Sequence, residues 1–162
     1  MHRQDITIAK HFIKATKDIL GTMAGIAPRE GKPFVRKNGP QEGNISAIIG
    51  VTGMRKGSIC VNFGREAAKE LIVGMLGDDI VDEQQDMEDA VGEISNMISG
   101  QARASLDAEG LNMQGSTPTL ITGSGHSIHY TASGPIIAIP FELGEGAFTV
   151  EFCFEPAEPE KA

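Results

Sequence analysis

The chain has 162 residues, of which 40% are hydrophobic and 22% are charged, so it can bury the core of one globular domain. Its formal net charge of −8 disfavours binding to nucleic acid or to an anionic membrane surface, because both attract basic patches. No apolar run reaches the roughly 18 residues of a membrane span, and no signal peptide opens the chain. We therefore expect a cytoplasmic protein in which Cys60 and Cys153 stay reduced and partly buried.

The first part of the chain predicts a helix followed by strands. The helix spans residues 5–23, has Asp5 as a possible N-cap and carries an apolar stripe, whereas residues 1–4 are expected to be frayed. Three strand candidates and a shorter helix follow, and the last two strands form a hairpin. The strands cover residues 32–37, 44–51 and 58–63, and the short helix covers residues 65–76.

The longest predicted element is a helix from Asp82 to Gly110. Asp82 is a good N-cap, Gln85 completes a start that resembles a capping box, and Gly110 is a natural end. The apolar residues recur at steps of four and three, which places them along one side of a helix. They are Met87, Val91, Ile94, Ile98, Ala102 and Leu106. About 27 helical residues would span roughly 40 Å, which is the width of a domain.

After Gly110 the sequence again predicts a series of strands, as it does after the first helix. Residues 116–122 predict a strand that Pro118 restricts to an edge of the sheet, and residues 126–132 could add another edge strand. Two more strands follow, and the second of them alternates apolar and polar residues. They cover residues 134–141 and 147–154. The tail at residues 156–162 is rich in proline and charge, so we expect it to be disordered.

An internal echo relates the two halves of the chain. Residues 56–63 resemble residues 145–152, with glycine, valine and phenylalanine at matching places, and each copy follows a helix and an aliphatic strand. This pattern favours an α+β fold of two degenerate α-β-β-β repeats in a single domain over residues 5–155. Two ordinary hairpins with the same turn chemistry would also produce the echo.

The side of the long helix opposite the apolar stripe is polar. Glu93 and Asn96 are neighbours there, because residues three positions apart lie side by side on a helix. Gly92 and Gly100 flank them, although a glycine inside a helix costs about 0.5–1 kcal/mol relative to alanine. The helix thus presents a carboxylate beside a carboxamide on an open surface. An ordinary solvated helix face would also carry such residues.

The run from Met87 to Gly100, which contains Glu93 and Asn96 as an ExxN pattern, resembles the ExxN helix of the CheC/CheX/FliY family of bacterial chemotaxis phosphatases. Residues 12–25 resemble the first helix of the CheX members, and the likeness extends over residues 5–155. It implies a CheC-like fold, in which two α-β-β-β units share a central β-sheet with long helices packed on it. The first helix contains no glutamate or asparagine, so we expect one active centre per chain.

The resemblance implies a phosphatase that acts on a phosphorylated CheY-type response regulator in chemotaxis. Asn96 would orient the water that attacks the aspartyl phosphate, since phosphoryl transfer depends largely on positioning. A carboxamide suits this task, because it both donates and accepts a hydrogen bond and carries no charge to repel the phosphate. Glu93 would pair with a lysine of the receiver domain and anchor the docked helix.

The same resemblance implies further contacts and partners. Gly92 and Gly100 could let the receiver's loops approach, and Asp89 and Arg103, on the same helix side, could steer docking from the rim. The protein would need no metal or other cofactor of its own, because the Mg²⁺ belongs to the receiver. It would form a homodimer and would have no nucleic-acid or membrane partner.

Two other classes of function fit the sequence. One is a non-catalytic module that binds phosphorylated receiver domains, like the middle domain of the flagellar switch. The intact pair of Glu93 and Asn96 disfavours it, because a pure binding module needs no carboxamide to position water. The other is a structural or adaptor domain that has kept the fold, and its binding to a partner would not depend on phosphate.

Overall fold

The computed structural model of the chain describes residues 1–40 and 43–156. The predicted disordered tail, residues 156–162, lies outside the described residues except for Pro156. Helices and antiparallel strands both contribute, so the predicted α+β class is confirmed.

The elements alternate along the chain in two similar halves. The helices are α1 (Arg3–Ala24), α2 (Arg65–Leu76), the 3₁₀ turn η1 (Gly77–Asp79) and α3 (Glu83–Ala108). The strands of the first half are β1 (Arg29–Glu30), β2 (Phe34–Arg36), β3 (Gly39–Pro40), β4 (Ile45–Gly53) and β5 (Gly57–Phe63). The strands of the second half are β6 (Met113–Gly115), β7 (Thr119–Thr122), β8 (Ser127–Ile128), β9 (Ile136–Leu143) and β10 (Gly146–Phe154).

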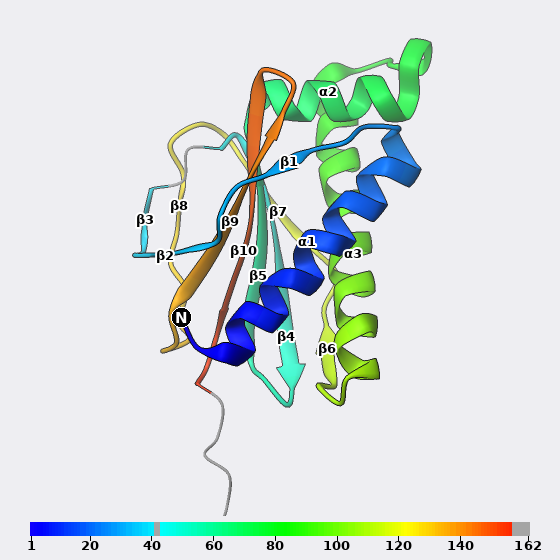
Figure 1. Cartoon of the computed structure of the whole chain (residues 1–162). Coiled ribbons are helices and arrows are strands. Elements are labelled where there is room, and N and C mark those ends of the chain that lie inside the picture. The colour runs from blue at the N-terminus through cyan, green and yellow to red at the C-terminus, as the bar shows by residue number, and fades with distance from the viewer. Residues whose placement is uncertain (41–42, 157–162) are drawn as a thin grey trace, which may run out of the picture.

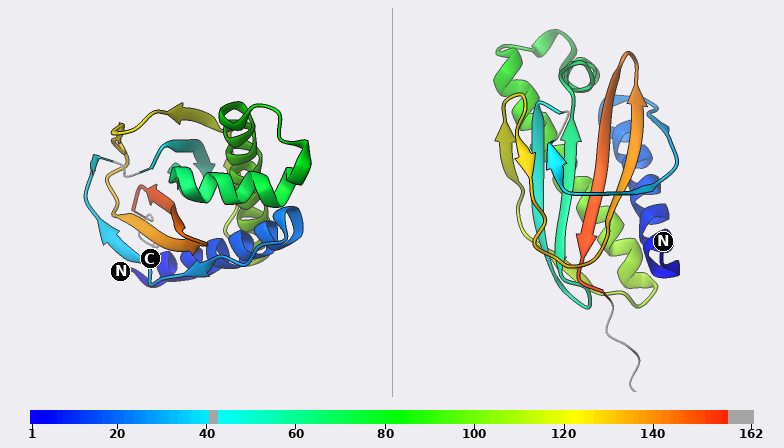
Figure 2. Two further views of the ribbon diagram at one scale, coloured as in Figure 1. Left: turned by 90° about the horizontal axis from the view of Figure 1, so that it is seen from above. Right: turned by 90° about the vertical axis from the view of Figure 1, so that its left-hand side faces the viewer.

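The two long helices lie on one face of the main sheet. α1 and α3 cross each other over that face, and α2 lies across one end of it (Figure 1). The views in Figure 2 show the other face, where β3, β8 and the segment that leads into β9 lie outside the sheet. The molecule is therefore a helical layer on an antiparallel sheet whose second face is covered by irregular chain.

The order of the strands agrees with a duplicated unit. β5 and β10 end the strand runs of the two halves; they pair at the centre, with β4 and β9 on their outer sides. The outer strands of each half cross over to the other half, so that β1 and β2 pair with β9, and β6 and β7 pair with β4. From either edge, the sheet therefore presents the first strand of one half and then the fourth and fifth strands of the other half. Val61 and Val150, which the two echo segments share, are paired directly opposite each other at the centre of this arrangement.

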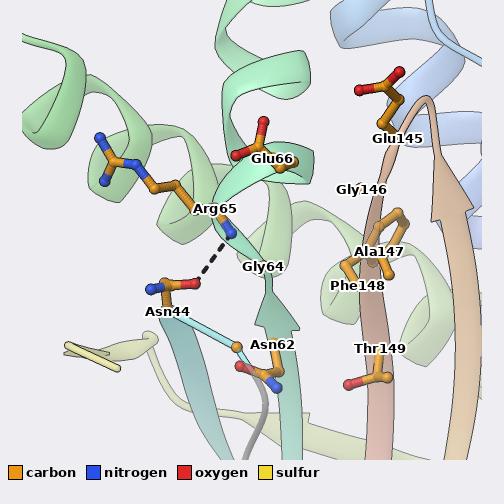
Figure 3. A pocket seen from close by; sticks show the side chains of 11 residues that line it. Asn44, Asn62, Gly64, Arg65, Glu66, Glu145, Gly146, Ala147, Phe148 and Thr149 are labelled. Carbon is orange, nitrogen blue, oxygen red and sulfur yellow. Dashed lines mark hydrogen bonds between the residues drawn. The ribbon is translucent and has the colours of Figure 1, made fainter. Parts of the chain in front are cut away.

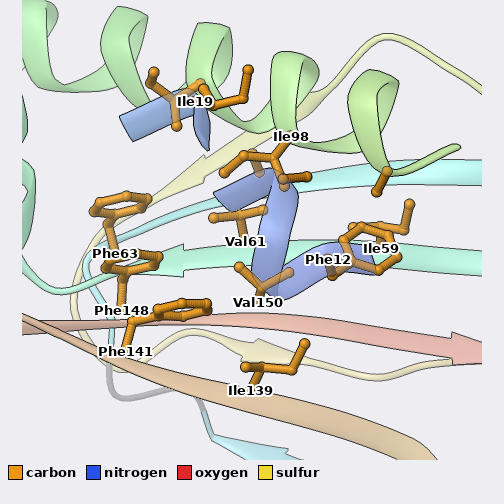
Figure 4. Packing of buried hydrophobic residues seen from close by; sticks show 14 of the residues in the cluster. Phe12, Ile19, Ile59, Val61, Phe63, Ile98, Ile139, Phe141, Phe148 and Val150 are labelled. Carbon is orange, nitrogen blue, oxygen red and sulfur yellow. The ribbon is translucent and has the colours of Figure 1, made fainter. Parts of the chain in front are cut away.

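The hydrophobic core lies between the sheet and the two long helices (Figure 4). Three phenylalanines from adjacent strands stack in it: the ring of Phe148 lies 4.5 Å from that of Phe63 and 4.8 Å from that of Phe141, centroid to centroid. Full burial of such a side chain contributes about 1.5–3 kcal/mol, and each aromatic pair adds about 0.5–1.5 kcal/mol. This column favours one register of β5, β10 and β9, because a slip of one residue would turn the rings out of the core.

The opposite face of the sheet carries a buried ion pair. Glu151 of β10 is 1% exposed, and its Oε1 accepts a hydrogen bond from Arg36 Nη2 of β2 at 2.8 Å. The Tyr130 hydroxyl donates to the same carboxylate at 3.0 Å, and burial raises the pKa of Tyr130. These bonds hold β2 and the segment after β8 on the sheet. Removal of one partner from such a buried pair typically costs about 3–5 kcal/mol.

The start of α1 differs from the sequence prediction. α1 begins at Arg3, and His2 is its N-cap: the Nδ1 atom accepts a hydrogen bond from the Gln4 amide at 3.2 Å. Arg3 and Gln4 are therefore helical rather than frayed. Asp5 is not the N-cap; it is buried, with its Oδ1 3.7 Å from Arg55 Nη1 in the β4–β5 turn.

Two predicted strands of the second half also need correction. The strand predicted at residues 116–122 shortens to β7, which begins after Pro118 and pairs with β4 at the sheet edge as expected, since Pro118 has no N–H to donate. The chain before it forms β6, a separate short strand that the sequence did not predict and that also pairs with β4. The strand predicted at residues 126–132 shrinks to β8. This short strand pairs with β3 in a separate small sheet and does not extend the main one.

Both cysteines are free and buried, so we predict that native thiols resist modification at pH 8. Burial raises the pKa of Cys60 to about 12 and also raises the pKa of Cys153, so the reactive thiolate is scarce at that pH. An aromatic disulfide reagent at pH 8 should release almost no thiolate chromophore from the folded protein and two equivalents after unfolding in guanidinium chloride. Two fast equivalents from the folded protein would contradict this prediction.

Candidate functional site

The long helix α3 is closed at its start by two side chains. Asp82 is the N-cap, and its Oδ1 accepts a hydrogen bond from the Gln85 amide at 3.1 Å. The Gln85 side chain does not complete the predicted capping box, because its Nε2 donates to Asp89 at 2.9 Å instead. Asp86 takes that role, since its Oδ2 accepts from the amides of Val81 at 2.9 Å and Asp82 at 3.2 Å. The positive end of the helix dipole is thus satisfied by two carboxylates.

One side of α3 is buried along its whole length. The buried residues recur at steps of three and four, as the predicted apolar stripe requires. They are Met87, Ala90, Val91, Ile94, Ser95, Ile98, Ser99, Ala102 and Leu106. The opposite side therefore faces solvent, and packing of the buried side fixes which residues it displays.

Glu93 and Asn96 lie next to each other on this solvent side, and both are exposed. At a separation of three residues their Cβ atoms are about 5–6 Å apart. Within residues 1–40 and 43–156, neither side chain makes a hydrogen bond or an ion pair. A carboxylate and a carboxamide without internal partners, on a helix held by the core, can both bind groups of another molecule.

The two flanking glycines of α3 have different surroundings. A Cβ atom on Gly92 would meet the methyl carbons of Leu120 in β7 at 3.6 and 3.7 Å, whereas a Cβ on Gly100 would meet nothing within 4 Å. The space beside Gly92 is therefore bounded by a side chain of this protein. Only the space beside Gly100 is open to a partner in the way that we expected for both glycines.

Arg103 and Asp89 are each engaged within the chain. Arg103 Nε donates to the Ser99 hydroxyl at 3.0 Å, and the guanidinium lies over β6, where a Cβ on Gly115 would be 2.8 Å from Nε. Asp89 is exposed and accepts the hydrogen bond from Gln85. Asp89 lies one helical turn before Glu93, whereas Arg103 is half-buried and held against the sheet edge at β6.

A hollow of about 450 Å³ lies apart from this helix face, at the start of α2 (Figure 3). Asn44 Oδ1 accepts a hydrogen bond from the Arg65 amide there at 3.2 Å, and Asn62 and Thr149 face the same hollow. Glu66 and Glu145 line it as well, so it is lined by both acidic and neutral polar groups. None of the residues predicted for the site contributes to it.

Neither metal ligation nor a membrane span is indicated in the part of the chain that the structure describes. No group of three or more His, Cys, Asp or Glu side chains there is placed to hold a metal ion. In the same residues, no helix is long and apolar enough to cross a membrane.

The combination of an antiparallel sheet and a layer of long helices on one of its faces is the fold of the CheC-like class. The family described as "Chemotaxis phosphatase CheX" matches residues 45–142, which include all of α3. The chain therefore belongs to the CheX family.

Individual members of the family are similar over most of the chain. The CheY-P phosphatase CheX of Thermotoga maritima is 25% identical over 140 residues, which cover 86% of this chain and 89% of that protein. The crystal structure of the chemotaxis protein CheX from Desulfovibrio desulfuricans is 52% identical, with a TM-score of 0.86 over 92% of this chain and 99% of that one. The fold is also that of CheX in the CheX–CheY–BeF3–Mg²⁺ complex from Borrelia burgdorferi, at 22% identity and a TM-score of 0.73, over 91% and 97% of the two chains.

Proposed function

We propose that this protein is a phosphatase that hydrolyses the aspartyl phosphate of a CheY-type response regulator. The observation that carries the proposal is the exposed pair Glu93 and Asn96, which has no hydrogen-bond or ion-pair partner among the described residues and lies on a helix whose other side is buried. The similar Thermotoga maritima protein is a CheY-P phosphatase, and the Borrelia burgdorferi relative was crystallised with CheY, BeF3 and Mg²⁺. Membership of the CheX family supports the same activity.

Asn96 would act by positioning water. A phosphorylated receiver domain already holds the Mg²⁺ and the cations that neutralise its phosphoryl group, so hydrolysis lacks mainly a nucleophile in line with the bond that breaks. The Asn96 carboxamide can orient that water by accepting a hydrogen bond from it through the side-chain oxygen. Because α3 is held by the core along its length, the carboxamide is delivered with little loss of freedom on docking.

Glu93 would act by anchoring the docked helix. Its carboxylate lies beside Asn96 and has no cationic partner within the described residues, so it is available to pair with a cation of the receiver. A charge-assisted hydrogen bond of this kind fixes orientation as well as contributing affinity. Asp89 and Arg103 would add weaker, salt-sensitive contacts at the rim.

The proposal also covers the source of the Mg²⁺, the cellular compartment and the number of active centres. The chain would supply no metal, and the Mg²⁺ needed for hydrolysis would be bound by the receiver domain. We place the reaction in the cytoplasm, where receiver domains are phosphorylated from ATP. α1 contains no glutamate or asparagine, so each chain would have a single active centre.

Asn96→Ala should lower the rate of dephosphorylation at saturating receiver by about 100-fold, because the water loses its positioning group. The measurement is the decay of a phosphorylated CheY-type receiver with Mg²⁺, alone, with this protein and with the variant. Asn112→Ala is the matched control, since Asn112 is exposed and lies beyond the far end of α3. Unchanged acceleration by the Asn96 variant would refute the mechanism. Binding without acceleration by the natural sequence would favour the non-catalytic module.

Glu93→Ala should mainly weaken docking, with a rise of about tenfold in KM and a nearly unchanged rate at saturation, because uniform binding is lost. Steady-state kinetics against receiver concentration separates the two quantities. Glu70→Ala on α2 is the matched control, since Glu70 is an exposed helical glutamate on another surface. A loss of saturated rate without loss of affinity would assign Glu93 a different role.

The family resemblance also leads us to propose a homodimer. Phe34 and Val35 on the edge strand β2 are adjacent, exposed and apolar, which suits a contact between two copies. Light scattering at micromolar concentration should give twice the mass of the 162-residue chain. A single monomeric mass would exclude a stable dimer under those conditions.

A further inference from the structure

An exposed leucine borders the proposed active centre from a different element. Leu120 belongs to β7 and is paired with Ala47 of β4, and residues directly opposite each other in an antiparallel pair point to the same side of the sheet. Ala47 is buried in the core beneath the helices, so Leu120 also points to the helical side. Because β7 is at the sheet edge, Leu120 extends past the cover of the core and is 38% exposed.

Leu120 is held against α3 at Gly92. Its two methyl carbons lie 3.6 and 3.7 Å from the place of a Cβ on Gly92, which is ordinary van der Waals contact. Gly92 and Asn96 are four residues apart on α3 and therefore neighbours on its surface. Leu120 thus forms one edge of the surface that carries Asn96 and Glu93.

Leu120 is an exposed apolar side chain beside a surface that is mostly polar, where Met97 of α3 is half-buried. Within the described residues, the exposed large hydrophobic side chains include none from α3. The other members of that set lie at the chain start, on β2, in the β4–β5 turn, on α2 and before α3: Met1, Ile6, Phe34, Val35, Met54, Val73 and Val81. Stable interfaces usually combine polar contacts with a desolvated apolar anchor near the centre, and Leu120, as an exposed apolar side chain beside this face, can supply one.

We propose that Leu120 is an apolar docking residue of this site, which packs on an apolar side chain of the phosphorylated receiver domain beside its phosphorylated aspartate. The inference rests on the proposed function. Because Leu120 packs on Gly92, its distance from α3 is fixed. Leu120 therefore limits how closely the partner approaches Asn96. Since the chain carries a net charge of −8 and the receiver's site is phosphorylated, an uncharged contact adds affinity that does not depend on salt.

The test separates affinity from chemistry. Leu120→Ser should weaken binding of a receiver domain activated with beryllium fluoride and Mg²⁺ by about tenfold, because the buried apolar contact is lost. The rate of dephosphorylation at saturating receiver should stay within about twofold of the natural protein. Raising the salt concentration should leave the ratio of the Kd values unchanged for Leu120→Ser, whereas it should reduce the ratio for Glu93→Ala.

Matched variants identify the cause. Leu120→Met keeps an apolar side chain and should bind the activated receiver with the Kd of the natural protein. Met54→Ser removes an exposed apolar side chain from the β4–β5 turn and should leave that Kd unchanged.

The outcomes distinguish this inference from the proposed activity. Normal affinity in a folded Leu120→Ser variant, checked by its melting temperature, would overturn the docking role. If that variant is unfolded, Leu120→Gln keeps the length of the side chain, and its Kd tests the loss of the apolar contact in the same way. If the natural protein binds the activated receiver but does not speed its dephosphorylation, the phosphatase proposal fails, and the Leu120 inference is still decided by the Kd values. No binding by the natural protein would overturn both.

Discussion

Burial of one side of α3 against the sheet is the constraint on which the rest of the molecule depends. That packing joins the sheet to the helical layer, and it fixes the rotation of a 26-residue helix about its own axis. A rotation by one residue, about 100°, would move the buried stripe into solvent and the polar side into the core. The exposure of Glu93 and Asn96 is therefore set by the apolar residues behind them. A site that must position a water molecule gains from this, because its rigidity comes from the core and not from the site itself.

The two faces of the sheet are stabilised in different ways. The face under α1 and α3 is apolar and includes the stacked rings of Phe63, Phe148 and Phe141. The other face uses the buried pair of Arg36 and Glu151 to hold irregular chain. The proposed catalytic surface belongs to the first layer, and the chain that covers the second face lies on the other side of the sheet.

The sequence predicted the elements with strong periodicity and missed those defined by single contacts. The α3 helix, the β4–β5 hairpin and the α2 helix follow the predicted bounds closely, because the apolar period and the capping residues act over neighbouring positions. The start of α1 was wrong because the Asp5 carboxylate pairs with Arg55, which is 50 residues away. The strand predicted at residues 126–132 was largely wrong because its pairing partner is β3 and not the main sheet. The echo of residues 56–63 and 145–152 did indicate the duplicated topology.

By itself, the sequence determined the class of fold, the helix that carries Glu93 and Asn96, and their side-by-side placement, since all three follow from local periodicity. Only the tertiary structure decided what surrounds that pair. Gly92 faces Leu120, Gly100 faces open space and Arg103 is drawn onto Gly115, and each of these depends on where the edge strands β6 and β7 lie. No local pattern encodes those contacts, because they join residues of α3 to residues 12 or more positions away through the pairing of β4. The physical reason is that a helix face is specified by residues three and four apart, whereas its neighbours are specified by the packing of the whole sheet.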